Sequence, residues 1–438
     1  MNWTLGGVVI STNPVYETTV NGELDLVANF KKLQYKVEVT YGENGSVTGN
    51  GVYEYGTELA IVAKPNEDYA LKYWNVNDEI VAPTGDTLFV TVNKPIRVMA
   101  EFVRDIYTQT VTFARGWNWM STYLNEEQSF GTMTTYANRV LDQQNELFRD
   151  PQFGLVGGIS KIEPNKGYKV DASTIFSITM RGHIQGVDVA ALSLLQGWNW
   201  MAYPYFETKN VADVLTNAED GDRIVAQEGF SEYDGSSWEG TVVSFTPGQG
   251  YLYKSATQKT LAFDFTEAPA GSRMAKSQIS NLKSQTSSVD PHQYPSTMNI
   301  TARIYRDGME LPGSQYTVYA YAGDELRGVS QFVGSNHYLT VYGDEPVSIS
   351  FIVESAETGE TFAAAETLTF VSDVVGSRKS PYAVNISTTT GISQQMADQP
   401  MTIYTLDGIL VSRDATIRTL HTLPKGVYIV NGRKTVVK

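Results

Sequence analysis

Cysteine is absent from this chain of 438 residues. Disulfides, thiol catalysis and cysteine-ligated zinc are therefore excluded, although the absence does not choose a compartment. No apolar run reaches the roughly 18 to 20 residues that a membrane helix needs, so we expect no transmembrane segment. Residues 1–20 also lack the basic and then apolar layout of a signal peptide. We expect either a cytoplasmic protein or a fragment, and the repeats described below favour a fragment.

Lysine and arginine are also fewer than aspartate and glutamate, 33 against 48. The formal net charge is −15, and no stripe of lysine and arginine is long enough to offset the repulsion that this charge exerts on phosphate groups. We therefore do not expect nucleic acid as a partner.

Histidine is scarce as well, and no two histidines have the spacing of metal ligands. The four are His183, His292, His337 and His421. No glycine-rich loop precedes a helix in the way that phosphate binding requires. The pairs Glu126/Glu127 and Asp220/Asp222 have the chemistry of an acid and a base, but spacing alone does not place them across a cleft. We predict no catalytic residue, no cofactor and no metal, and hence no enzyme.

Aromatic residues and glycine are plentiful. The chain has 26 Tyr, 17 Phe and 37 Gly, and only 18% of its residues are charged. This composition favours short strands joined by glycine turns. At roughly 150 residues per domain, the length allows about three or more domains. We predict an all-β, multidomain array of small β-grasp-like repeats, β-rich modules and β-sandwiches.

Two segments near the N-terminus repeat each other. Residues 3–30 can be laid over residues 74–102, so that Trp3 matches Trp74. The second copy has a front half, residues 35–73, in which apolar and polar residues alternate between glycine turns. The first copy lacks this half. We therefore expect the chain to start inside a repeat.

The complete copy has a recognisable order of residues. Valine, Gly-Asn-Gly, two tyrosines and Gly-Thr follow one another within residues 47–57, and Trp74 and then Ala100-Glu101-Phe102 come later. This order resembles the bacterial repeats of the internalin B-repeat type. The resemblance implies small β-grasp-like units strung along surface proteins, with a spacer or adhesive role.

A second duplication follows. VTFARGWNWMSTYL at 111–124 returns as LSLLQGWNWMAYPYF at 192–206, and EPNKGYKV at 163–170 returns as TPGQGYLY at 246–253. Because the two landmarks recur at nearly equal spacing, we predict two duplicated domains. They resemble the GWN modules found near the ends of type IX secretion cargo, a resemblance that implies no established chemistry.

Each duplicated domain carries two tryptophans at positions i and i+2. On a strand both rings project to the same face, where they either join a buried core or form a platform for sugar rings. The four rings are those of Trp117, Trp119, Trp198 and Trp200, and Tyr123, Tyr203, Tyr205, Tyr233 and Trp238 would extend such a surface. The core is favoured, and the platform is the main hypothesis for ligand binding.

The remaining segments between these landmarks have simpler patterns. Helical or loop stretches are expected at 131–147 and 211–218. Residues 267–296 lose the hydrophobic period and predict a linker. Residues 297–386 alternate strongly, which predicts an antiparallel sandwich. At the GDELRG turn an ion pair is favoured over a binding site, and Glu219 to Asp222 is favoured as a solvated turn over a calcium loop.

The final residues, 401–438, combine two turns with a basic end. Asp407-Gly408 predicts a tight hairpin turn, and Pro424 ahead of Gly426 predicts another. The segment resembles the type A sorting domain of type IX secretion over its whole length. The matched residues are Asp407, Gly408, Leu423, Pro424, Lys425, Gly426, Val427, Tyr428, Lys434 and Lys438. The resemblance implies passage through the outer membrane, removal of the domain and attachment at the surface.

These patterns lead to one functional hypothesis and one alternative. The favoured hypothesis is a non-catalytic structural and adhesive stalk of a secreted cell-surface protein. Its partners would be the type IX secretion machinery and its sortase, with host or matrix glycans or proteins as further candidates. The alternative is a carbohydrate-binding protein that uses the four tryptophans. The expected boundaries are 1–32 (half a repeat), 33–104 (a complete repeat), 105–185 and 186–266 (the duplicated domains), 267–296 (linker), 297–386 (sandwich) and 387–438 (sorting domain).

Overall fold

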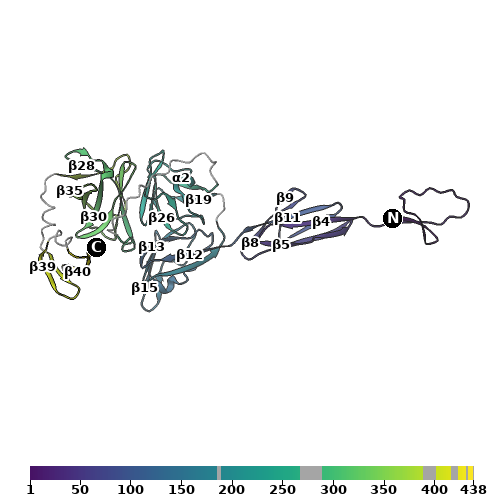
Figure 1. Ribbon diagram of the computed structural model, residues 1–438, viewed down its shortest axis with the longest axis horizontal. Coiled ribbons are helices and arrows are strands. Elements are labelled where there is room, and N and C mark those ends of the chain that lie inside the picture. Colours follow the sequence, from purple (N-terminus) through teal and green to yellow (C-terminus); the bar gives the residue numbers. More distant parts are fainter. Residues whose placement is uncertain (185–188, 267–288, 388–400, 416–422, 431–432, 438) are drawn as a thin grey trace. The chain divides into compact units, whose positions relative to one another are not determined.

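A computed structural model describes residues 1–184, 189–266, 289–387, 401–415, 423–430 and 433–437. The prediction of an all-β, multidomain chain is confirmed, because nearly every regular element is a strand (Figure 1). The chain divides into two compact units, residues 1–107 and residues 108–438. Each unit is described by itself below.

The first sheet of unit 1 has three strands in the order β2-β1-β3. They are β1 (Asn2–Leu5), β2 (Val8–Ser11) and β3 (Leu26–Asn29). Trp3 on β1 pairs with Ala28 on β3. Trp74 pairs with Ala100 in the same way further along the chain. The two copies of the repeat therefore share a cross-strand pair, but Trp3 is only half-buried whereas Trp74 is 1% exposed.

The rest of unit 1 is a pair of facing sheets with the orders β10-β7-β5 and β6-β4-β11-β8-β9. Its strands are β4 (Gln34–Tyr41), β5 (Gly45–Thr48), β6 (Gly51–Glu54), β7 (Thr57–Pro65), β8 (Tyr69–Val76), β9 (Glu79–Val81), β10 (Thr87–Val92) and β11 (Ile96–Arg104). β11 runs parallel to β4, and the other pairs are antiparallel. Alternate residues such as Ile61, Trp74 and Val98 point inward and form one core.

Unit 2 begins with two modules of the same topology. Module 1 (residues 108–184) has a five-stranded sheet β13-β17-β14-β15-β16, and module 2 (residues 189–266) has the matching sheet β20-β26-β22-β23-β24. Each also has a two-stranded sheet, β12-β18 or β19-β27. In the two stretches expected to be helix or loop, the helices are only four residues long, α1 (Met133–Tyr136) and α2 (Val211–Val214), and the first stretch also contains β14 and the start of β15.

The elements of module 1 are β12 (Tyr107–Phe113), β13 (Gly116–Ser121), α1 (Met133–Tyr136), β14 (Ala137–Leu141), β15 (Glu146–Asp150), β16 (Gly154–Gly157), β17 (Gly167–Ala172) and β18 (Phe176–Gly182). Those of module 2 are β19 (Val189–Leu194), β20 (Gly197–Ala202), β21 (Lys209–Asn210), α2 (Val211–Val214), β22 (Arg223–Ala226), β23 (Gly229–Tyr233), β24 (Trp238–Gly240), β25 (Ser244–Phe245), β26 (Gly250–Ser255) and β27 (Lys259–Asp264).

A larger β-domain follows, in which one core is enclosed by the sheet β31-β30-β34-β35-β37-β28-β33-β32. Its strands are β28 (Ser296–Arg306), β29 (Met309–Glu310), β30 (Tyr316–Ala322), β31 (Glu325–Val329), β32 (Gln331–Val333), β33 (Asn336–Gly343), β34 (Ser348–Ser355), β35 (Thr361–Thr369), β36 (Val374–Val375) and β37 (Tyr382–Ile386), and a short 3-10 turn spans Gly313–Gln315.

This domain differs from the expected antiparallel sandwich in one respect. After β35 the chain runs alongside β28 in the same direction, so that β36 and β37 both pair with β28 in parallel. The two halves of the sheet are joined through a single pair, Ala364 with Ile386. The result is two layers around a shared core, joined by the antiparallel pair of β35 and β37.

The last described strands form a four-stranded antiparallel sheet in the order β39-β38-β40-β41. They are β38 (Met401–Thr405), β39 (Leu410–Ala415), β40 (Gly426–Val430) and β41 (Arg433–Val437). Ile403, Tyr428 and Val430 form a small core, and Leu423 packs against it.

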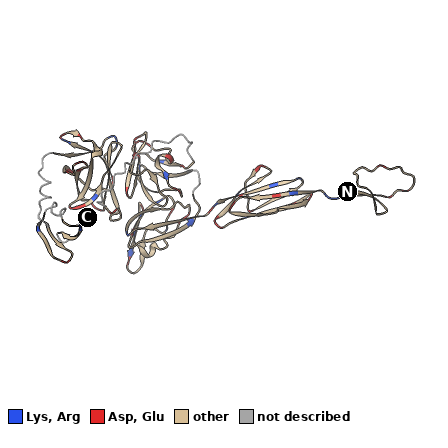
Figure 2. Cartoon of the chain, viewed as in Figure 1, with Lys and Arg blue, Asp and Glu red and all other residues tan. Residues whose placement is uncertain are grey.

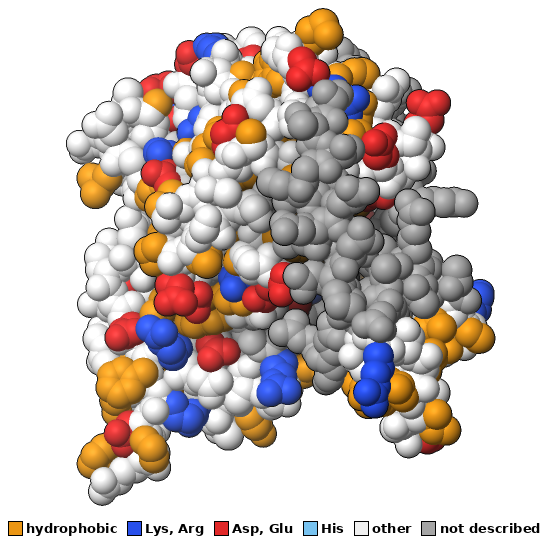
Figure 3. All heavy atoms as spheres, turned by 90° about the vertical axis from the view of Figure 1, so that its left-hand side faces the viewer, with side chains coloured by type: hydrophobic (Ala, Val, Ile, Leu, Met, Phe, Trp, Pro, Cys, Tyr) orange, Lys and Arg blue, Asp and Glu red, His pale blue; other side chains and the backbone are white. Residues whose placement is uncertain are grey.

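Charge is dispersed over the described residues. Lys and Arg, like Asp and Glu, are scattered over the chain among a majority of other residues (Figure 2). On the face drawn in Figure 3, basic side chains lie beside acidic ones. In the part of the chain that the structure describes, no helix is long and apolar enough to cross a membrane.

Candidate functional site

The Gly-Trp-Asn-Trp segment of each module starts a strand in the same way. Gly116 has a φ of 92° and Gly197 a φ of 90°, a conformation that favours glycine. The asparagine then closes the preceding turn: Asn118 accepts from the Ala114 N–H at 2.9 Å and donates to its carbonyl at 2.8 Å. Asn199 makes the matching bonds to Leu195 at 2.9 and 2.8 Å. The motif thus forms the turn that precedes β13 or β20 and the first residues of that strand.

The four tryptophans lie where module 1, module 2 and the β28–β37 domain meet. Trp117 and Trp119 are 8% and 6% exposed, and Trp198 and Trp200 are half-buried. Trp119, Trp198 and Trp200 share one apolar cluster with Phe230 of module 2 and Tyr338 of β33. Of the neighbouring aromatics, Tyr123, Tyr203 and Tyr205 are buried, and Tyr233 and Trp238 are half-buried. Trp119, Trp198 and Trp200 therefore join modules to one another, whereas Tyr203, Tyr205 and Trp238 belong to the core of module 2.

Two glutamines connect the modules through backbone atoms. Gln227 of module 2 donates to the Trp117 carbonyl at 2.7 Å and accepts from the Trp119 N–H at 2.9 Å. Gln143 of module 1 donates to the Trp198 carbonyl at 2.7 Å and accepts from the Trp200 N–H at 2.9 Å. Each glutamine therefore occupies a free strand edge of the other module. Neither glutamine was among the functional residues predicted from the sequence.

A second set of contacts is reciprocal too. The Ser121 N–H of module 1 donates to the Gly248 carbonyl at 2.8 Å. In return the Ala202 N–H of module 2 donates to the Asn165 carbonyl at 3.1 Å. Met120 bridges Gln249, and Met201 bridges Lys166. Each contact that module 1 makes to module 2 thus recurs with the two modules interchanged, as in an interface with two-fold symmetry.

Lys169 on β17 lies at the centre of this junction. Its Nζ is 4.4 Å from the ring centre of Trp119 and 4.5 Å from that of Trp200. The residue is 3% exposed. Burial lowers the pKa of Lys169 to about 7. The two indole faces oppose this shift, because their negative centres attract the charged form.

Polar contacts tie the β28–β37 domain to module 2. Asp373 accepts from Trp198 Nε1 at 3.2 Å and from Lys254 Nζ at 2.8 Å. Arg378 forms ion pairs with Asp234 at 3.1 Å and with Glu239 at 3.3 Å. A polar cleft of about 180 Å³ lies alongside, between Glu228 and the strands around Tyr338. Its volume is below the roughly 300 Å³ at which ligand pockets begin.

The end of the expected linker takes part in the junction. The Trp117 N–H donates to the His292 carbonyl at 2.7 Å, and His292 Nδ1 approaches the Trp117 carbonyl at 2.5 Å. Residues 289–295 are therefore held in place, and β28 begins at Ser296. Residues 267–288 lie outside the described part of the chain.

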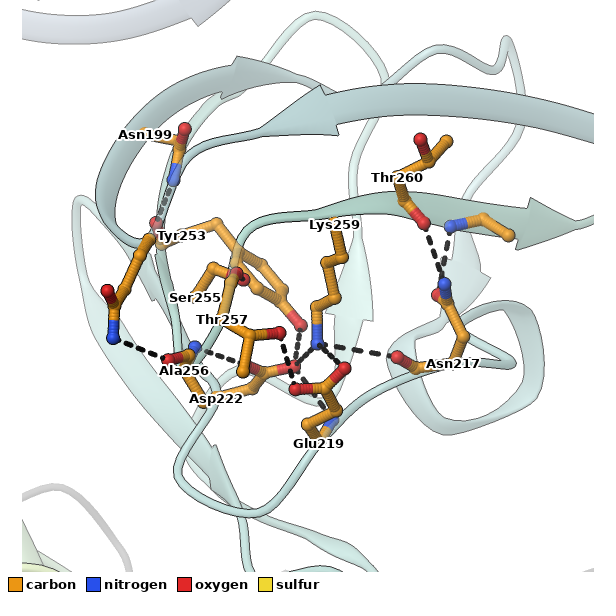
Figure 4. Close-up of polar contacts among 12 residues, drawn as sticks. Asn199, Asn217, Glu219, Asp222, Tyr253, Ser255, Ala256, Thr257, Lys259 and Thr260 are labelled. Atoms are coloured by element: carbon orange, nitrogen blue, oxygen red, sulfur yellow. Dashed lines mark hydrogen bonds and ion pairs between the residues drawn. The ribbon is translucent and has the colours of Figure 1, made fainter.

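Module 2 contains a buried polar cluster around Asp222 (Figure 4). Asp222 is fully buried. Its carboxylate accepts from the Ala256 N–H at 2.8 Å, from the Glu219 N–H at 2.8 Å and from the Tyr253 hydroxyl at 2.6 Å, and it forms an ion pair with Lys259. The prediction of a solvated turn is therefore wrong for Asp222. Its oxygens face donors, which does not suit a calcium ligand.

The other polar candidates are dispersed over unit 2. Glu126 pairs with His183, and Ser330 Oγ lies 3.1 Å from His337 Nδ1, but His337 is 1% exposed. The predicted ion pair at the GDELRG turn is confirmed, with Arg327 and Glu325 at 3.1 Å. Among the described residues, no group of three or more His, Cys, Asp or Glu is arranged to hold a metal ion.

The sorting-signal residues occupy the turns and the small core of the last sheet. Gly408 has a φ of 81°, and its N–H donates to the Thr405 carbonyl at 3.0 Å, as the hairpin prediction requires. The Tyr428 hydroxyl donates to the Pro424 carbonyl at 2.9 Å. Lys425 is exposed and Leu423 half-buried. The backbone of Lys434 lies in β41, Asp407 lies in the hairpin turn, and Gly426 and Val427 begin β40. Lys438 lies outside the described residues.

Comparison with known proteins gives one family. Residues 35–106 match the family of divergent InlB B-repeat domains. This match confirms the resemblance predicted for the complete repeat of unit 1. None of the curated proteins and none of the solved structures matches the chain.

Proposed function

We propose that this chain is a non-catalytic part of a secreted cell-surface protein, in which it acts as a structural and adhesive stalk. The match of residues 35–106 to a divergent InlB B-repeat carries the proposal, because a repeat of this kind fits a surface or adhesive protein. The buried contacts between the modules of unit 2 add support. They join small β-domains through fixed polar and aromatic contacts, which is what a spacer requires.

We further propose that residues 401–438 are the signal through which the type IX secretion machinery and its sortase place the protein at the outer face of the outer membrane. The sequence resemblance supports this proposal, and so does the hairpin at Asp407-Gly408. Lys425 is exposed at a turn, where a partner has access to it. The edges of a four-stranded sheet also leave backbone groups free for strand pairing.

Deletion of residues 401–438 tests the sorting proposal in a cell that has the type IX machinery. The truncated protein is expected to remain in the periplasm, and normal surface display would refute the proposal. Two point variants separate folding from recognition. Gly408→Val strains a turn with a φ of 81° and should block export by unfolding the sheet. Lys425→Glu leaves the small core intact and should reduce export only if the charge is recognised.

Carbohydrate binding through the tryptophans is the alternative that the sequence raises. The positions of the rings give it little support, because Trp117 and Trp119 are covered at the junction. A sugar would reach them only if the modules separated. Titration of the full chain with a panel of glycans, followed by tryptophan fluorescence, tests this alternative. Saturable quenching that Trp198→Ala abolishes would favour it over a purely structural role.

A further inference from the structure

The contacts between module 1 and module 2 follow an approximate two-fold relation. Gln143 and Gln227 occupy equivalent positions: each lies three residues after a strand residue, Val140 or Ile224, that pairs with the equivalent residue of β17 or β26. Each glutamine makes the same two bonds to the other module. A surface that binds its own duplicate in this way is self-complementary.

A self-complementary surface can bind more than one partner. Each module presents the same strand edge and the same glutamine to the other module and to a copy of itself on another chain. The hydrogen bonds are to backbone atoms in both directions, so they do not distinguish one module from the other. Selectivity must come from side chains that differ between the modules.

The central side chain of the junction does differ. Lys169 pairs with Trp119 across β17 and β13, and Leu252 pairs with Trp200 across β26 and β20. The two residues are equivalent by position in the duplicated strands. Lys169 lies between Trp119 and Trp200, and Leu252 belongs to the same apolar cluster as both rings. The junction therefore contains one ammonium group and one leucine at its centre.

We propose that the tandem modules form an internal pseudo-dimer in which Lys169 directs module 1 to module 2 and away from a second copy of module 1. Two copies of module 1 would bring two Lys169 ammonium groups together inside one desolvated aromatic cluster. Like charges placed together in an interface are strongly unfavourable. With module 2 the single cation lies between two indole rings and faces a leucine. The covalent link within the chain raises the effective concentration of this partner.

Disulfide trapping in the full chain measures the pairing directly. The chain has no cysteine of its own, so only introduced thiols react. Met120 and Gln249 are paired across the junction, and the Cα atoms of such antiparallel pairs lie roughly 4.5 to 5.5 Å apart, within the range of a disulfide. The variant M120C/Q249C is expected to form a disulfide within one chain. The counterpart K166C/M201C is expected to do the same.

The role of Lys169 in partner choice is tested by adding a lysine at position 252 of module 2, with and without removal of Lys169. In the M120C/Q249C background, at a pH below 7 where Lys169 is charged, Leu252→Lys places a second ammonium group at the centre and should slow disulfide formation by at least about tenfold. Lys169→Leu should leave the rate equal or faster. The double variant K169L/L252K moves the single lysine to module 2, and it should restore the rate.

These outcomes decide the proposal. Rescue by K169L/L252K supports the charge argument, because a lysine that merely disrupted module 2 would not be rescued by a change in module 1. Slow trapping in both L252K and K169L/L252K would overturn the proposal, as would L252K that traps at the original rate. Disulfides found mainly between two chains in M120C/Q249C would also overturn it, since the partner would then be a second copy.

Discussion

Replacement of Asp222 by alanine should destabilise module 2 by about 3 to 5 kcal/mol, which is the usual cost of leaving a buried charge without its partner. Asp222 is fully buried, and the Lys259 side chain is 8% exposed. The substitution strands the ammonium group, the Tyr253 hydroxyl and two backbone N–H groups. Glu219 lies 3.8 Å from Lys259 Nζ, but it is 44% exposed and screened by water, so it offsets little of this cost.

Hydrogen exchange followed by mass spectrometry is the suitable assay, because a chain of several domains does not unfold in two states. Protection of the β22, β26 and β27 amides should fall by about two to three and a half orders of magnitude, at 1.4 kcal/mol per factor of ten. Asp220→Ala is the matched control: its pair with Lys379 is exposed on both sides and should cost at most about 1 kcal/mol. The double variant D222A/K259M should recover much of the loss. Protection in D222A within about fivefold of the original would refute the reasoning.

Four further predictions concern other buried groups. Trp74→Ala should cost about 3 to 5 kcal/mol and lower the exchange protection of β8 and β11, since the ring is 1% exposed. Gln227→Ala should lower the urea midpoint of unit 2 more than Gln143→Ala, because Gln227 is 7% exposed whereas Gln143 lies at the surface. Burial lowers the pKa of Lys169 to about 7, below the usual 10.5 of the unfolded chain, so the stability of the junction should rise with pH between 7 and 10.5, and Lys169→Met should remove that slope in urea titrations at pH 7 and 9. Burial lowers the pKa of His337 to about 4, below its usual 6.5, so the β28–β37 domain should lose up to about 3 kcal/mol as the pH falls from 6.5 to 4, and acid titration of His337→Phe should show a smaller loss.

The local patterns of the sequence predicted strands well. Alternation in β7 and β11 comes from one buried face, and the positive φ of Gly408 comes from a turn that Asp-Gly pairs favour. The direction of pairing was not predictable in the same way. β36 and β37 pair in parallel with β28, and the direction in which a strand joins an edge is a property of the assembled sheet, not of the strand's own pattern.

In the candidate site, too, some features were visible in the local sequence and others depended on distant strands. On β27, Lys259 lies two and four residues before Leu261 and Phe263, so its side chain points to the same inner face. This alternation is visible in the sequence and would have predicted an inward-facing lysine. The recurrence of glutamine at 143 and 227 was another such signal. The burial of Asp222 was not available from its own segment, because three of its partners, Tyr253, Ala256 and Lys259, come from β26, β27 and the turn between them.

The tryptophan pairs show why recurrence within one chain is informative. Burial inside each module and exposure as a platform both predict that the pair returns in each copy, so the repeat alone does not separate them. The structure adds a third possibility, in which each pair faces the other copy. Duplication of a self-complementary surface supplies its own partner, tethered at high local concentration. Once the partner is fixed, the two copies no longer need to remain identical, and under the proposal above the difference between Lys169 and Leu252 then disfavours the pairing of module 1 with a second module 1.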